Sequence, residues 1–130
     1  MSLVSTPMSV GELLDKITIL EIKSREIKDD NKLKNIRHEL ALLQQTWQQT
    51  GLRSGQTDAL QQSLEAINMK LWRIEDDIRI CEKDKNFGET FVQLARSVYF
   101  TNDERAAIKK QINELTGSDL VEEKSYESYE

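Results

Sequence analysis

The 130-residue sequence contains few of the residues that interrupt helices or cross-link chains: one proline, five glycines and one cysteine. This scarcity of proline and glycine excludes collagen-like and loop-dominated folds and disfavours β-sandwiches, which need more turn residues. The single cysteine, Cys81, allows no internal disulfide and is typical of a reducing compartment. With 38% apolar residues, the chain is expected to form one compact domain.

Long apolar runs are also missing, since the densest stretch covers only residues 17–20. A membrane-spanning helix needs about 18 or more consecutive apolar residues. The N-terminal residues have neither the basic segment nor the apolar segment of a secretory signal. We therefore expect a cytoplasmic protein that does not enter a membrane.

An excess of positive charge is absent as well, because the net charge is −5. Residues 117–130 carry five carboxylates against one lysine, so residues 1–116 are nearly neutral. Without a basic stripe, binding to nucleic acid or to an anionic membrane surface is disfavoured. We expect a single helical-bundle domain over residues 1–116 and an acidic tail over 117–130. The apolar residues of the tail allow two interpretations. The tail is either a frayed end, or a strap that docks on the bundle or on a protein partner.

Apolar residues recur at helical spacing, and no strand-like alternation is present. The spacing predicts five helices, with apolar stripes over residues 10–27, 33–47, 60–81, 87–98 and 108–115. The short link at residues 29–31 predicts that the first two helices form an antiparallel hairpin. In the third predicted helix, over residues 60–81, apolar residues repeat at steps of four and three, which favours coiled-coil packing. We expect an all-α, coiled-coil-like bundle: a hairpin and one long helix, closed by two shorter helices.

Several apolar residues lie off these stripes on a helical wheel. Isolated exposed apolar residues are ordinary, but a group of them on three long helices predicts a second buried surface. We therefore expect a homodimer formed through the long helices. The candidate interface residues are Ile19, Ile22, Leu42, Met69, Trp72 and Ile80.

Three carboxylates at the margins of the stripes are candidate metal ligands: Glu21, Glu75 and Glu82. Acids on facing helices hold Mg²⁺ or Mn²⁺ in some bundle enzymes, including helical nucleotide pyrophosphohydrolases. The acidic pairs are incomplete here, because Glu12 belongs to a helix cap and Asp15 is expected to point off its stripe. The simpler interpretation is that Glu21 and Glu75 each pair with an arginine four residues later. Outside this alternative, no cofactor is predicted.

A second candidate site lies where the fourth predicted helix meets the fifth. Thr101-x-x-Glu104 has the form of a capping box, which predicts a helix start there. The N-terminus of a helix attracts anions, and four residues could complete such a site: Arg96, Thr101, Asn102 and Arg105. Asp103 already supplies negative charge at this point, so plain capping is the alternative.

Five segments resemble a family of small uncharacterised helical proteins from bacteria and their phages. They are Ser9-Val10-Gly11-Glu12-Leu13-Leu14-Asp15-Lys16-Ile17-Thr18-Ile19-Leu20-Glu21-Ile22-Lys23, residues 71–79, 95–99 and 101–103, and Leu120-Val121-Glu122-Glu123-Lys124-Ser125-Tyr126. The resemblance implies a free-standing single domain and no particular activity. From the residues themselves, we expect a non-catalytic dimeric interaction or adaptor module. The alternatives are a metal-dependent nucleotide hydrolase and a protein that binds a small anion.

Overall fold

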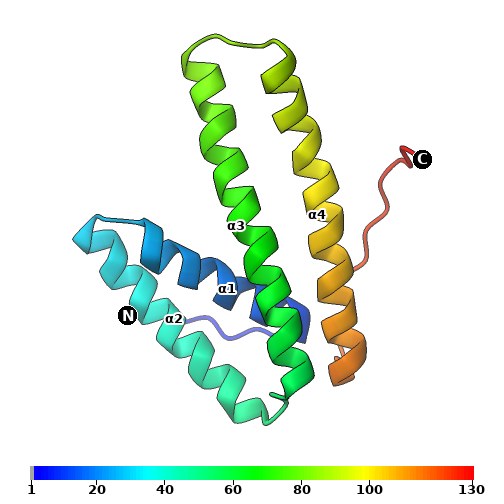
Figure 1. Ribbon diagram of the computed structural model, residues 1–130. Coiled ribbons are helices and arrows are strands. Elements are labelled where there is room, and N and C mark those ends of the chain that lie inside the picture. Colours follow the sequence, from blue (N-terminus) through cyan, green and yellow to red (C-terminus); the bar gives the residue numbers. More distant parts are fainter. Residues whose placement is uncertain (1) are drawn as a thin grey trace.

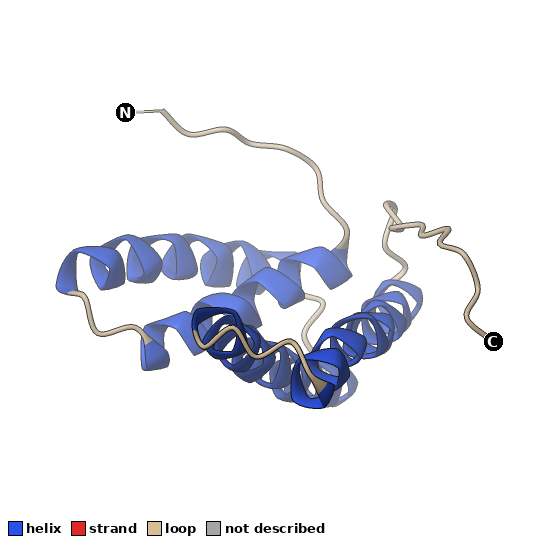
Figure 2. Cartoon of the chain, turned by 90° about the horizontal axis from the view of Figure 1, so that it is seen from above, coloured by secondary structure: helices blue, strands red, loops and turns tan. Residues whose placement is uncertain are grey.

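The computed structural model describes residues 2–130, and this part of the chain contains four helices and no strand. They are α1 (Val10–Glu26), α2 (Asp30–Thr50), α3 (Gly55–Lys83) and α4 (Glu89–Thr116). Helices α3 and α4 form a long antiparallel hairpin, and α1 and α2 form a shorter pair against its lower half (Figure 1). Figure 2 looks down this hairpin from the end at which α3 and α4 are joined. The expectation of an all-α bundle is confirmed.

The helix ends follow from local capping residues. Ser9, Asp29 and Ser54 each accept a hydrogen bond from the backbone N–H three residues later, at the starts of α1, α2 and α3. Helices α2 and α4 end at Gly51 and Gly117, whose φ angles of 68° and 63° lie in the left-handed region that glycine adopts without strain. These polar and glycine signals therefore set the lengths of the elements.

Helix α1 is the centre of the fold, because it packs against each of the other three helices. One face of α1 contributes leucine and isoleucine to the main apolar cluster, which comprises Leu13, Leu14, Ile17, Trp47, Leu64 and Ile112. A second face of α1 is also buried, and it contains Gly11, Asp15, Thr18 and Ile22 at steps of four, three and four. The two buried faces together account for eight buried residues among the 17 of α1.

The prediction of two short helices after residue 86 is wrong, because α4 runs without a break from Glu89 to Thr116. Thr101, the expected cap, lies in the interior of α4 and is only 1% exposed. It stands seven residues after Leu94 and seven before Ile108, so it occupies a position of the buried stripe. The buried stripe continues through a polar side chain, and α4 has no break at this position.

Residues 117–130 follow α4 without forming a helix, and they turn back along its outer side (Figure 1). Within residues 2–130, none of the helices has both the length and the apolar character required to cross a membrane.

Candidate functional site

A cluster of charged side chains lies where α1 crosses the α3–α4 hairpin. Asp15 of α1 is fully buried, and Arg105 of α4 donates to its carboxylate through Nε, at 3.0 and 3.1 Å, and through Nη2. The bond to Asp15 raises the pKa of Arg105, which therefore remains a cation. Asp15 lies off the main apolar stripe of α1, as the sequence predicts, but it is buried on the second face of that helix, which the sequence pattern did not predict.

Asn68 of α3 completes the enclosure of this carboxylate. Its Nδ2 donates to Asp15 Oδ1 at 2.8 Å and to Thr18 Oγ1 at 2.9 Å. Asn68 and Thr18 are themselves 5% and 0% exposed. A buried charge is tolerated only when it is paired and hydrogen-bonded, and here α1, α3 and α4 each supply part of that environment.

Lys109 connects the cluster to the acidic tail. Its Nζ lies 2.6 Å from Glu12 Oε2, 2.8 Å from Glu122 Oε2 and 3.7 Å from Asp15 Oδ2. Burial alone would lower the pKa of Lys109, but the hydrogen bonds to Glu12 and Glu122 outweigh it and the pKa is raised. The same hydrogen bond lowers the pKa of Glu122. The cluster therefore holds two cations against three carboxylates.

Below the charged cluster, the N-terminus of α1 is fastened to the C-terminus of α4. The backbone N–H of Gly11 donates to Asn113 Oδ1 at 2.7 Å, and that of Val10 donates to Ser118 Oγ at 3.2 Å. A Cβ atom at position 11 would lie 2.6 Å from the carbonyl oxygen of Lys109. Only glycine allows this approach, so Gly11 fixes where the two helices cross.

A groove of about 300 Å³ opens beside the charged cluster, between α1 and α3. It is lined by Ile19, Ile22, Asn68, Leu71, Trp72, Glu75, Asp76, Arg79 and Arg105. Two arginines and two acids line the groove; Glu75 pairs with Arg79 at 3.2 Å, whereas Arg105 is engaged by Asp15. The lining of the groove is therefore partly apolar, and the formal charges of its side chains sum to zero.

The six predicted interface residues do not share one environment. Ile22 is 1% exposed within a single chain, so its assignment to an outer surface is wrong; it lies on the second buried face of α1. Ile19, Met69 and Trp72 are half-buried, and Ile19 and Trp72 both line the groove. Ile80 and Leu42 are 55% and 37% exposed, on α3 and α2 respectively.

The three candidate metal ligands are not brought together. Glu75 and Glu82 are exposed on α3 and pair with Arg79 and with Lys85, the latter at 3.6 Å. Glu21 lies in a separate groove between α1, α2 and α3, where burial raises its pKa. Over residues 2–130, no group of three or more histidine, cysteine or acidic side chains is arranged to hold a metal ion.

The candidate anion site also lacks its predicted basis, because α4 has no N-terminus at Thr101. Asn102 is half-buried inside the helix, and Arg105 is engaged by Asp15. Arg96 lies over the ring of Phe100, 5.9 Å from its centroid. The four residues therefore lie along one continuous helix and do not share one environment.

Sequence reasoning missed the charged cluster because it counted only apolar residues as buried. The roles of Asn68 and Lys109 carried no separate signal. One signal was available on α1: Gly11, Asp15 and Thr18 continue to Ile22 at helical spacing, which marks a second face with small and polar members.

The chain matches a known protein family over almost its whole length. The model of a family described as "Family of unknown function (DUF6165)" covers residues 4–129 of the chain. Neither the curated proteins nor the solved structures yielded a match.

Proposed function

The chain belongs to this family of unknown function, and we propose that it is a non-catalytic interaction module that pairs with a second copy of itself. The pairing surface is the outer half of the α3–α4 hairpin, residues 74–98, which we call the arm. Figure 1 shows the arm extending beyond α1, with no third helix beside it. The remaining helices form the base from which the arm projects.

The observation that carries this proposal is the exposure of large apolar side chains on the arm. Ile80, Phe87 and Val92 are 55%, 51% and 44% exposed. Ile74 and Cys81 are buried in the seam between the two helices, but most of the other apolar seam residues are only half-buried: Ile78, Phe91, Leu94 and Val98. Two helices alone do not cover an apolar surface of this extent, and such patches mark sites of association.

In this proposal, the arm of a second copy covers the exposed apolar side chains of the first. Two antiparallel helix pairs that pack face to face form a four-helix bundle, the arrangement that the steps of four and three along α3 favour. A two-fold axis would place the same residues on both sides of the interface. Full burial of one isoleucine, valine or phenylalanine side chain contributes about 1.5–3 kcal/mol. Several partly covered residues are therefore needed to offset the cost of association.

The test is the molar mass of the purified chain in solution, measured by light scattering after size-exclusion chromatography. We expect twice the chain mass of 15.1 kDa at micromolar concentration. The double variant Ile80→Glu, Val92→Glu is expected to run as a monomer, because it places charge in the apolar interface. Both positions are exposed within one chain, so the fold is retained.

Leu42→Glu is the matched control, because Leu42 is a 37% exposed leucine on α2, away from the arm. This variant is expected to remain a dimer. A monomeric unmodified chain at high micromolar concentration contradicts the proposal. Dissociation by Leu42→Glu with a dimeric arm variant also contradicts it, since the interface would then lie on α2.

A further inference from the structure

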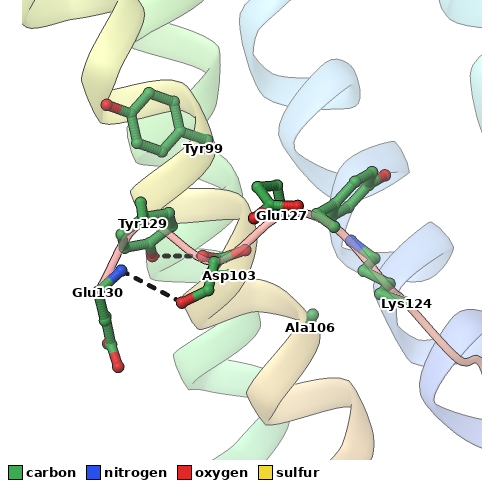
Figure 3. Close-up of a pocket in the computed structure, with 9 residues that line it drawn as sticks. Tyr99, Asp103, Ala106, Lys124, Glu127, Tyr129 and Glu130 are labelled. Atoms are coloured by element: carbon green, nitrogen blue, oxygen red, sulfur yellow. Dashed lines mark hydrogen bonds between the residues drawn. The ribbon is translucent and has the colours of Figure 1, made fainter.

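All three tyrosines of the chain line one open cleft between the tail and α4. The cleft has a volume of about 510 Å³, and we call it the tail cleft. It is lined by Tyr99, Asp103 and Ala106 of α4 and by Lys124, Tyr126, Glu127, Ser128, Tyr129 and Glu130 of the tail. Figure 3 shows the tail passing over α4, with Asp103 between the helix and Tyr129.

Tyr129 docks on α4 through its ring and its hydroxyl. The ring centroid lies 5.5 Å from that of Tyr99 and 5.0 Å from that of Phe100, the latter in an edge-to-face arrangement. The hydroxyl donates to Asp103. These contacts hold the tail over the helix, and they place aromatic faces beside a carboxylate.

The charge of the cleft is negative. Asp103, Glu127 and Glu130 line it, and Lys124 is the one cation among its lining residues. The surrounding aromatic cluster already takes a cation in the structure, since the guanidinium of Arg96 lies over Phe100. Aromatic faces attract ammonium groups through the negative potential above the ring, and carboxylates add to this attraction.

We infer that the tail cleft binds a small organic cation with two or more ammonium groups, such as a linear diamine or triamine. Three carboxylates against one lysine favour a ligand with more than one positive charge. The tyrosine rings suit the methylene chain between the ammonium groups, whereas a bare metal ion would gain nothing from them. The inference does not rest on the proposed pairing, because the cleft is formed within one chain.

Isothermal titration calorimetry of the full chain with putrescine and spermidine tests this inference. We expect saturable binding of one ligand per chain, tighter for the trication spermidine than for putrescine. Butane-1,4-diol, the neutral analogue of putrescine, is expected not to bind. Magnesium chloride at matched ionic strength is expected not to compete. Equal binding of the diol, or equal competition by magnesium, would overturn the inference.

Two cleft variants and one control locate the ligand. Tyr126→Leu removes a ring that is 80% exposed, and Glu127→Gln removes a cleft carboxylate, so neither threatens the fold. Each is expected to weaken spermidine binding by about two- to fivefold. Glu123→Gln makes the same charge change in the same tail, outside the cleft lining, and is expected to leave affinity unchanged. Equal weakening by Glu123→Gln would mean attraction to the tail charge alone and would refute the cleft as the binding site.

Discussion

Asp15 is the residue on which the crossing of α1 with the hairpin depends electrostatically. Asp15→Asn keeps the size of the side chain but leaves Arg105 and Lys109 without their buried anion. We expect a loss of about 3 kcal/mol in the free energy of unfolding, measured by urea denaturation followed by circular dichroism. Glu75→Gln is the control, because its ion pair with Arg79 is exposed and should contribute less than about 1 kcal/mol. Equal losses in the two variants would contradict this role for Asp15.

Gly11 makes the same crossing possible sterically. In Gly11→Ala the new Cβ would meet the carbonyl oxygen of Lys109 at 2.6 Å and Asn113 Oδ1 at 3.0 Å. The backbone cannot yield without separating α1 from α4, so we expect a loss of about 1–3 kcal/mol in urea denaturation. Gly55→Ala provides the comparison, since a Cβ there meets nothing within 4 Å. That variant is expected to be neutral or slightly stabilising, because alanine favours helix α3.

At the scale of a helix, α4 contains one buried polar group without a partner. Among the described side chains, the hydroxyl of Thr101 is the buried polar atom that forms no hydrogen bond. Thr101→Val keeps the side-chain shape and removes this group, so we expect a gain of about 1 kcal/mol in thermal denaturation. Thr57→Val should have the opposite effect, because the Thr57 hydroxyl accepts from the backbone of Ser54 and caps α3. A loss of stability in Thr101→Val would show that the hydroxyl has a partner in solution.

The sequence predicts most of the helices, because their signals are local. Ser9 and Gly117 mark true ends, and the apolar steps of α3 continue into buried positions at Leu64, Ile74 and Cys81. The prediction of a helix start at Thr101 is wrong because a threonine followed by polar residues is also common at the start of a helix. In the folded chain Thr101 is buried in the interior of α4, and such burial depends on tertiary packing that the local sequence does not show.

The charged cluster was less accessible to sequence reasoning than the helices. A carboxylate is normally expected in water, and only partners distant in the sequence make its burial tolerable. Arg105 lies 90 residues from Asp15, and Asn68 lies 53 residues away. A single sequence does not reveal such pairs, although the helical spacing of Gly11, Asp15 and Thr18 limits where they occur.

The tail is joined to α4 by an ion pair that should respond to acid. The hydrogen bond from Lys109 lowers the pKa of Glu122 below its ordinary 4.5. The stabilisation is therefore complete above pH 4.5, the value in the unfolded chain, and is lost as the pH falls through the lowered value. On the alkaline side, the raised pKa of Lys109 keeps the pair intact beyond pH 10.5.

Nuclear magnetic resonance of the backbone amides in the tail can follow the detachment of the tail from α4 as this ion pair is lost. We expect the amides of residues 119–124 to shift toward disordered values only below pH 4.5. Glu122→Gln should show the same released shifts already at pH 7, whereas Glu123→Gln should not. Release of the unmodified tail near pH 6 would contradict the assigned pair.

The whole molecule combines a well-covered base with an uncovered arm. Helix α1 takes part in three sets of contacts: the main apolar cluster, the charged cluster, and the hydrogen bonds between its N-terminus and the C-terminus of α4. The arm has only the seam between α3 and α4, so its stability within one chain is expected to be the lower of the two. A partner that covers the arm would therefore stabilise the part of the chain that most lacks contacts.

Pairing through the arm makes thermal stability depend on protein concentration. Because unfolding of a dimer releases two chains, the melting temperature should rise by about 3 °C for each tenfold increase in concentration. Differential scanning calorimetry over a hundredfold range measures this slope. In Ile80→Glu, Val92→Glu the slope should vanish, since a monomer melts at a temperature independent of concentration; Leu42→Glu should keep it. A flat response of the unmodified chain, or an unchanged slope in the arm variant, would show that the arm does not hold two copies together.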